Sequence, residues 1–558
     1  MRKSNVEILV IVMFVLAVTL PFINKAYHID DAAFLFIADQ IGKDPLHPYS
    51  FIAEWGNGPK QAIFLNDTPF LPYLIALLTY LLGRKEWILH LVYIIFPLTA
   101  AISFYFFAKK FLKKALIPAL IMVAMPTFLP NAHNLMFDVP VLAAWMLAIT
   151  LFVYGVDKNN HKLMLSGSIV AGICYWIKPT GAIIIFLIAL YCILAKKYKY
   201  ISYIIVPVLF ILLFALQNYI FEKDVIASNY ASQLIKNKNS IELLSSYIFG
   251  ELSYIGGATV FPLFFIYPLI RRKRAPVIMS LSALVSIAAS YFLWKFSVNF
   301  VSGRYSLFEI SLFFVFVTCS LFFIIITILR NFHNTIAGLL DILRVKKSKY
   351  DAALIFIFLW FIGALVLNSV IVGGAVRFNT ILLPPLILLY FLQLQESGAK
   401  NLGRIASLIL VSTLIIGLSV AYADYEFANA YRNFVKSIPE TYKTSANEVR
   451  FSGGAEFQYY MMEKGYKIMQ VDDNTPKKGD VVIKVDILFL RKMSEELLNR
   501  SKLAATVSYS SNFPVRVQNP DAHAGFYTYA GGLLPFSFSD SGLETFRIYA
   551  VEKEAKSS

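Results

Sequence analysis

Apolar stretches of about 20 residues recur along this chain, with short charged loops between them. Hydrophobic residues make up 58% of the sequence and charged residues only 15%, whereas soluble domains are about one quarter charged. Within lipid, every backbone polar group must find its partner inside the protein, which a helix achieves within one segment. The chain therefore predicts a polytopic α-helical membrane protein.

The formal net charge of +16 would suggest nucleic-acid binding in a soluble protein. Here the basic residues cluster in short loops between apolar segments, which is the pattern that sets membrane orientation, so nucleic acid is excluded as a partner. The cysteines, Cys174, Cys192 and Cys319, all fall inside apolar segments and lack metal-site spacing. They are interpreted as packing residues.

Loop charge also predicts the topology. Arg2 and Lys3 place the N-terminus in the cytoplasm, so the first span, residues 6–23, leads to the outer side. The apolar segment 68–82 is short and contains two prolines. If it spanned the membrane, the lysines at 109–114 would lie outside, so it is predicted to lie along the interface. Alternation of the remaining loops then gives about thirteen spans.

The composition changes at residue 423. Residues 1–422 are predicted to form the membrane domain, with a first outer loop at 24–86. Residues 423–558 are predicted to form an extracytoplasmic soluble α/β domain. Its short alternating runs predict strands, and two further segments have helical character: strands at 448–451, 467–471, 481–485, 505–509 and 546–551, and helices at 456–464 and 494–499.

Acidic residues stand at two predicted outer loop ends. Asp30 and Asp31 follow the first span, and Asp138 precedes a later one. Each could be a solvated loop acid or a helix cap. An acid at the membrane boundary could instead accept a proton from an acceptor hydroxyl or amine, which is general-base chemistry. A carboxylate beside an apolar span is also costly unless it is paired or faces water.

Three single cations occupy predicted outer turns: Lys178, Arg304 and Arg377. Each could be an interfacial anchor with its charge reaching for water. Together on the same face as the acids, they favour an anionic lipid phosphate as ligand. The sequence contains no Gly-rich phosphate loop, no H-E-x-x-H and no G-x-S-x-G motif.

These residues resemble the motifs of the GT-C-fold lipid-phosphate-sugar transferases, which include glycosyltransferase family 39, the protein O-mannosyltransferases and the bacterial aminoarabinose transferases. The family's first outer loop carries an Asp, a second acid and then an aromatic residue, similar to Asp30, Asp31 and Phe34. Its H-P-P-L-Y-like run resembles N-D-T-P-F at 66–70, where Asn66 replaces the usual His. Its other motifs are similar to Asp138, I-K-P-T at 177–180, R-F-N at 377–379 and L-L-P at 382–384.

The resemblance implies a GT-C fold and an inverting transfer of a sugar from a polyprenyl-phosphate carrier of undecaprenyl or dolichyl type. The acceptor would be a lipid, a glycan or a protein at the extracytoplasmic face of a prokaryotic plasma membrane. Asp30 would be the general base, with Asp31 and Asp138 as further catalytic acids.

The resemblance also implies roles for the remaining residues. Lys178, Arg304 and Arg377 would hold the donor phosphate, and His28 and Asn66 would position the acceptor or the loop. It implies no certain cofactor and leaves open a divalent metal ion near Asn66.

Two other functions are compatible with the same residues. In a transporter or lipid flippase, membrane acids and cations would line a translocation path. Transporters place such groups near the bilayer midplane, often on broken helices within paired repeats. Here they stand at loop ends, and no internal repeat is found. A GT-C scaffold that serves only in assembly would not need both acids.

Overall fold

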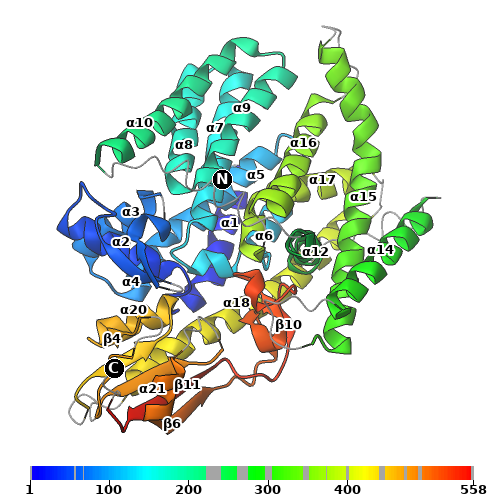
Figure 1. Cartoon of the computed structure of the whole chain (residues 1–558). Coiled ribbons are helices and arrows are strands. Elements are labelled where there is room, and N and C mark those ends of the chain that lie inside the picture. The colour runs from blue at the N-terminus through cyan, green and yellow to red at the C-terminus, as the bar shows by residue number, and fades with distance from the viewer. Residues whose placement is uncertain are drawn as a thin grey trace.

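A computed structural model describes residues 3–55, 58–66, 68–221, 241–259, 274–295, 304–343, 351–372, 374–396, 401–438, 446–470, 474–487 and 493–554. Helices fill most of the molecule, and a C-terminal sheet lies at one end (Figure 1). Within these ranges, nine helices are long and apolar enough to cross a membrane. The predicted α-helical membrane architecture is confirmed, and the count of about thirteen spans stays a prediction.

Fourteen helices of the described residues make up the helical part outside the first outer loop. Their bounds are α1 (Lys3–Thr19), α4 (Glu86–Tyr93), α5 (Ile95–Ala108), α6 (Leu116–Ala124), α7 (Asp138–Lys158), α8 (His161–Ile177), α9 (Ile183–Leu194), α10 (Ile205–Phe221), α12 (Ile241–Ala258), α14 (Ala275–Lys295), α15 (Leu307–Leu343), α16 (Ala352–Val366), α17 (Leu383–Glu396) and α18 (Leu402–Ser437). The three cysteines are free and buried among them, as predicted for packing residues.

The first outer loop folds into α2 (Asp31–Lys43), a hairpin of β1 (Ile52–Trp55) with β2 (Gly58–Gln61), and α3 (Phe70–Leu82). With 13 residues, α3 is about 20 Å long, too short for a hydrocarbon core of about 30 Å. This length agrees with the prediction that segment 68–82 lies along the interface.

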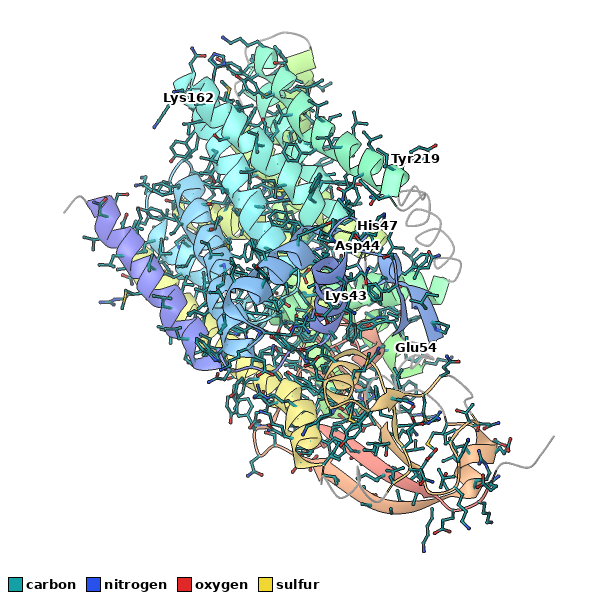
Figure 2. All side chains as sticks on the ribbon, turned by 90° about the vertical axis from the view of Figure 1, so that its left-hand side faces the viewer. Lys43, Asp44, His47, Glu54, Lys162 and Tyr219 are labelled. Atoms are coloured by element: carbon teal, nitrogen blue, oxygen red, sulfur yellow. The ribbon has the colours of Figure 1, made fainter. Side chains whose placement is uncertain are left out.

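The first outer loop and the turn at 157–162, which loop alternation predicts to face the cytoplasm, lie in different parts of the molecule. Figure 2 shows Lys162, in the first turn of α8, at the end of the helical part remote from the C-terminal sheet. Asp44, His47 and Glu54 of the first outer loop lie nearer that sheet. Loops predicted to face opposite sides of the membrane are thus well separated.

Helix α18 joins the helical part to the sheet. Its 36 residues span about 54 Å, so it extends well beyond the hydrocarbon thickness. The predicted domain boundary at 422/423 falls inside this helix. Beyond that point its aromatic face packs on the sheet, where Phe434 stacks on Phe546 with ring centroids 3.8 Å apart.

The C-terminal domain (described residues 446–470, 474–487 and 493–554) contains a five-stranded mixed sheet in the order β4-β3-β5-β11-β6. All five predicted strands and both predicted helices form. Their bounds are β3 (Val449–Ser452), α20 (Ala455–Glu463), β4 (Lys467–Ile468), β5 (Val481–Val485), α21 (Glu495–Arg500), β6 (Ser501–Tyr509) and β11 (Glu544–Val551).

Four two-residue strands between β6 and β11 were not predicted, because two residues carry no periodicity: β7 (Val515–Arg516), β8 (Gln518–Asn519), β9 (Ala524–Gly525) and β10 (Ser537–Phe538). They build a compact lobe that touches the helical part. In Figure 1, β10 lies near α12, away from α20, which lies below α2 and α4. The C-terminal domain therefore meets the helical part at two places.

Candidate active site

Asp30 forms an ion pair with a residue 347 positions away. Arg377 Nη1 donates to Asp30 Oδ2 at 2.6 Å, and the Asp30 side chain stays 30% exposed. Asp30 occupies the N-cap position of α2, but its side chain makes no cap hydrogen bond. The capping alternative therefore fails for Asp30, and the carboxylate is directed toward the cation.

The second predicted acid and cation also meet. Lys178 Nζ donates to Asp138 Oδ1 at 2.9 Å. Pro179 disfavours the helical region for the preceding residue, so α8 ends at Ile177 and Lys178 is extended. Asp138 begins α7, where an acid is favoured by the helix dipole.

The two pairs lie side by side around one aromatic ring. Phe378 has Lys178 Nζ 4.6 Å from its ring centroid and Arg377 Cζ 5.2 Å from it. Phe378 lies in the 3-10 helix η8 (Val376–Leu382), which carries Arg377 into the cluster. We call Asp30, Asp138, Lys178 and Arg377 the paired cluster. It holds two cations and two carboxylates on segments that are distant in sequence.

Asp31 has partners outside the paired cluster. It is fully buried, and its carboxylate accepts the backbone N–H groups of His28 at 2.9 Å and Leu135 at 2.8 Å. Burial raises the pKa of Asp31 to about 7, even though the N–H of His28 and the charge of Lys25 act to lower it. The adjacent acids therefore differ: Asp31 ties two loops together, and Asp30 is partly open.

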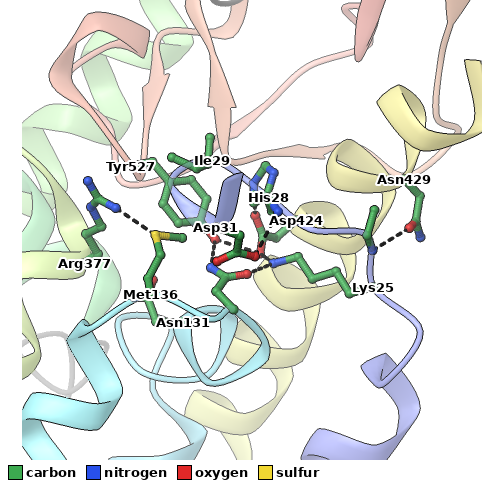
Figure 3. A network of polar contacts seen from close by, with 12 residues as sticks. Lys25, His28, Ile29, Asp31, Asn131, Met136, Arg377, Asp424, Asn429 and Tyr527 are labelled. Atoms are coloured by element: carbon green, nitrogen blue, oxygen red, sulfur yellow. Dashed lines mark hydrogen bonds and ion pairs between the residues drawn. The ribbon is translucent and has the colours of Figure 1, made fainter. Parts of the chain in front are cut away.

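A second set of polar and charged residues lies near Asp31 (Figure 3), and its side chains are buried. His28 Nε2 is 3.1 Å from Asp424 Oδ1 on α18, and its Nδ1 is 3.2 Å from Glu456 Oε1 on α20. Lys25 pairs with Asp424, and the Tyr527 hydroxyl donates to Asp424 Oδ2 at 2.9 Å. We call these five residues the buried network.

The buried environments shift two further groups that lie outside the spans. Burial alone would lower the pKa of His28, but Asp424 and Glu456 outweigh it and raise the pKa above its usual value. For Lys178 the balance is reversed. Burial lowers its pKa by more than Asp138 raises it. Two carboxylates oppose burial in each case, but the charge of Arg377 also lowers the pKa of Lys178.

The other predicted site residues lie outside the paired cluster. Asn66 forms a turn with Thr68, whose hydroxyl donates to the carbonyl of Ile177, next to Lys178. Arg304 is exposed just before α15, and within the described ranges no contact joins it to the paired cluster. Asp67 lies outside the described residues. The described ranges also contain no group of three or more His, Cys, Asp or Glu side chains able to hold a metal ion.

Sequence analysis did not identify four members of the buried network: Lys25, Asp424, Glu456 and Tyr527. Lys25 follows the first span and has the pattern of an interfacial anchor. Asp424 stands where α18 changes from apolar to polar. Glu456 lies within a predicted helix of the C-terminal domain. None of these patterns indicates a buried partner from another segment.

An apolar groove of about 400 Å³ lies between α9 and α16. Trp145, Trp360 and Leu367 line its inner part, and the Phe186 ring on its rim is 73% exposed. One wall, α9, continues the segment that starts at Lys178 through the 3-10 helix η4 (Pro179–Ala182). The lining also includes Ile381 of η8, the helix that carries Arg377.

Comparison with protein families finds a match over residues 66–220 to the family described as "Dolichyl-phosphate-mannose-protein mannosyltransferase". The matched range includes Asn66, Asp138 and Lys178, whereas Asp30 and Arg377 lie outside it. Within that range the match confirms the resemblance to GT-C lipid-phosphate-sugar transferases. A comparison with curated proteins finds no match.

Several solved structures are similar at low identity. ArnT from Cupriavidus metallidurans bound to undecaprenyl phosphate is 12% identical, with 89% of this chain and 96% of that chain covered and a TM-score of 0.43. The same protein in its apo state is 11% identical, with 97% of each chain covered and a TM-score of 0.40. The arabinosyltransferase EmbB from Mycobacterium smegmatis is 11% identical, with 91% and 47% covered and a TM-score of 0.30.

Proposed function

Taking the family match over residues 66–220 as the premise, we propose that this chain is an integral-membrane glycosyltransferase. It transfers a sugar from a polyprenyl-phosphate carrier to a lipid, glycan or protein acceptor at the extracytoplasmic face. The observation that carries the proposal is the paired cluster, in which two cations and two carboxylates from distant segments meet around Phe378.

The apolar groove suits the lipid part of such a donor. A polyprenyl chain needs an apolar surface open to the bilayer, and the groove between α9 and α16 offers one with aromatic walls. Because the segments that bear Lys178 and Arg377 both continue into its lining, a phosphate at the cations would place its chain along the groove. Charge-assisted hydrogen bonds from both cations would hold the phosphate.

The reaction is a single displacement that inverts the anomeric carbon. The acceptor oxygen or nitrogen forms a bond to that carbon as the bond from carbon to the phosphate oxygen breaks. The acceptor proton passes to the Asp30 carboxylate, and the bonding electrons leave with polyprenyl phosphate. Lys178 and Arg377 stabilise the charge that develops on the leaving phosphate, where electrostatic catalysis acts most strongly.

Asp138 and Asp31 take supporting roles in this mechanism. Asp138 holds Lys178 at 2.9 Å and offsets the cost of a buried cation. Asp31 fastens the first loop to the segment at Leu135, because its carboxylate accepts the backbone N–H of that residue. Arg304, which is exposed, would meet the lipid headgroup region. We retain Asp30 as the single general base.

The groove offers a direct test. A Cβ added at Gly363, which lines the groove, meets no atom within 4 Å, so Gly363→Phe should block the groove without disturbing the fold. Gly403 on α18 has the same free space and does not line the groove, so Gly403→Phe is the matched control. We expect Gly363→Phe alone to weaken binding of undecaprenyl phosphate, measured by native mass spectrometry, about 10-fold or more.

Transfer itself can be assayed in proteoliposomes with a panel of undecaprenyl-phosphate hexoses, pentoses and amino sugars. The proposal expects release of undecaprenyl phosphate for at least one donor, and loss of that release in Asp30→Asn. Movement of lipid across the bilayer with no covalent change in any donor would overturn it in favour of a flippase.

A further inference from the structure

A carboxylate of the C-terminal domain holds the main chain directly before Asp30. Glu456 is fully buried in the first turn of α20. Its Oε2 accepts the backbone N–H of Ile29 at 3.1 Å, and its Oε1 lies 3.2 Å from His28 Nδ1. Both carboxylate oxygens therefore hold the two residues that precede the proposed general base.

Ile29, whose N–H donates to Glu456, has an unusual backbone conformation. Ile29 has a φ of +49°, in the left-handed region, which a β-branched residue adopts only when its surroundings compel it. Its side chain is only 5% exposed and belongs to the main hydrophobic core. Such strain concentrates at functional sites, where neighbouring contacts over-determine the backbone.

The C-terminal domain reaches this point from a helix that itself begins with a left-handed residue. Ala455, the first residue of α20, has a φ of +50°. One turn beyond Glu456, the Tyr460 hydroxyl accepts the backbone N–H of Tyr27 at 2.8 Å. Residues four apart share one face of a helix. One face of α20 therefore binds the main chain at Tyr27 and Ile29.

The same domain also binds the segment that carries Arg377. The N–H of Val376 donates to the carbonyl of Phe526 at 3.0 Å, and the N–H of Tyr529 donates to the carbonyl of Gly374 at 2.7 Å. Both partners of the Asp30–Arg377 pair are thus attached to the C-terminal domain through main-chain hydrogen bonds within three residues.

We propose that Glu456 is a positioning residue of the transferase: by holding Ile29 in its left-handed conformation, it sets the Asp30 carboxylate against Arg377. The C-terminal domain is then a structural part of the active site, not an appended module. This inference rests on the proposed function for the identity of Asp30 as the base. The geometry it describes can be tested separately.

A merely structural carboxylate offers the matched control. Glu544 is also fully buried in the C-terminal domain, and it accepts the Tyr431 hydroxyl at 2.8 Å and the N–H of Ile487 at 2.7 Å. These two partners lie in α18 and in the C-terminal domain, not in the first outer loop. Its removal should destabilise the domain as removal of Glu456 does, but should leave Ile29 where it is.

The kinetic experiment compares Glu456→Ala, Glu456→Gln and Glu544→Gln in full-length protein, with the donor from the panel that the wild type uses. We expect kcat per folded molecule to fall about 10- to 100-fold in Glu456→Ala, because displacement of a catalytic group by about 1 Å has effects of this size. Glu456→Gln should recover part of it, because its amide oxygen still accepts the N–H of Ile29. Glu544→Gln should retain kcat within about 2-fold. An unchanged kcat in Glu456→Ala would overturn the inference.

A second substitution isolates the backbone conformation. Glycine adopts positive φ without a Cβ penalty, so Ile29→Gly should make the left-handed conformation less dependent on Glu456. We expect Glu456→Ala to lower kcat clearly less in the Ile29→Gly background than in the wild type. A loss of equal size in both backgrounds would show that Glu456 does not act through the conformation of Ile29.

A structure of Glu456→Ala by cryo-electron microscopy separates this inference from the proposed function. The inference expects Ile29 to leave the left-handed region and the Asp30–Arg377 distance to lengthen from 2.6 Å. If that occurs while the wild type transfers no sugar from any donor, only the proposed function fails. If the wild type transfers sugar and the pair keeps its distance in Glu456→Ala, only the inference fails.

Discussion

The paired cluster and the buried network contain similar residues but differ in how far they are enclosed. In the paired cluster, Asp30 is 30% exposed and Lys178 12% exposed. In the buried network, the side chains of Lys25, His28 and Asp424 are each at most 1% exposed. Charged groups that are shielded from water stabilise the fold if each of them has its partner. Charged groups that are partly exposed to solvent can exchange partners.

The paired cluster and the buried network both contact the first outer loop but differ in their free hydrogen-bonding atoms. In the part of the chain that the structure describes, two polar atoms of the paired cluster, Asp138 Oδ2 and Arg377 Nε, are buried with no hydrogen-bond partner. An incoming phosphate or acceptor could hydrogen-bond to these atoms. In the buried network, Glu456 uses both carboxylate oxygens within the protein. We infer that the paired cluster reacts and the buried network positions it.

The largest expected effect is on catalysis by Asp30. Asp30→Asn removes the proton acceptor and should lower kcat about 10²- to 10⁴-fold, the usual contribution of a general base. Because Asp30 is partly exposed and pairs with Arg377 alone among the described residues, the melting temperature should change little. Kinetics and a thermal melt in detergent measure the two effects. Equal turnover in the variant and the wild type would remove Asp30 from the mechanism.

Breaking the buried network should instead reduce stability. Asp424→Asn leaves Lys25 and His28 facing a neutral amide, and removing one partner of a buried ion pair costs about 3–5 kcal/mol. The matched control is Asp486→Asn, which breaks the more exposed pair with Arg547 and should cost at most about 1 kcal/mol. Chemical denaturation measures both. Similar losses in the two variants would contradict the distinction between enclosed and open charges.

Much of this architecture follows from local patterns. Apolar length predicts the membrane helices, prolines and loop charge predict that segment 68–82 does not cross, and period-two alternation predicts the five sheet strands. Each of these signals lies within a window of about 20 residues or fewer. The candidate site residues Asp30, Asp138, Lys178 and Arg377 were also found locally, as charges at the ends of apolar segments.

The partnerships could not be predicted in the same way. Asp30 and Arg377 are 347 positions apart, and a single sequence contains no signal for that contact. Asp30 and Asp31 are neighbours, so their different roles depend on side-chain direction at the start of α2, which a helix rotates by about 100° per residue. The left-handed Ile29 was also hidden, because neither glycine nor asparagine marks the position.

A smaller effect is expected on donor affinity. Lys178→Met removes one charge-assisted contact, worth about 1.5–3 kcal/mol, so affinity for undecaprenyl phosphate should fall about 10- to 150-fold. Arg304→Met, at an exposed position outside the paired cluster, should change affinity by less than about 3-fold. Native mass spectrometry of both variants tests this. An equal loss in Arg304→Met would add Arg304 to the phosphate site.

The last expected effect is on the pH dependence of stability, where the two enclosed groups His28 and Asp31 differ in their pH windows. Both have pKa values raised by folding, so the native state binds more protons and stability falls as pH rises. For Asp31 the loss lies between its ordinary value of 3.8 and about 7. For His28 the loss begins at its ordinary value of 6.5 and ends at its raised pKa.

Denaturation at pH 5, 7 and 9 should therefore show two separable slopes, each at most about 1.4 kcal/mol per pH unit. Asp31→Asn should remove the slope below pH 7, and His28→Gln the slope above it. The groups that face His28 are Lys25, Asp31, Asp424, Glu456 and Tyr527. If His28→Gln kept the slope above pH 7, that proton binding would have to be assigned to one of these neighbours. His28 would then contact Asp424 and Glu456 as a neutral imidazole.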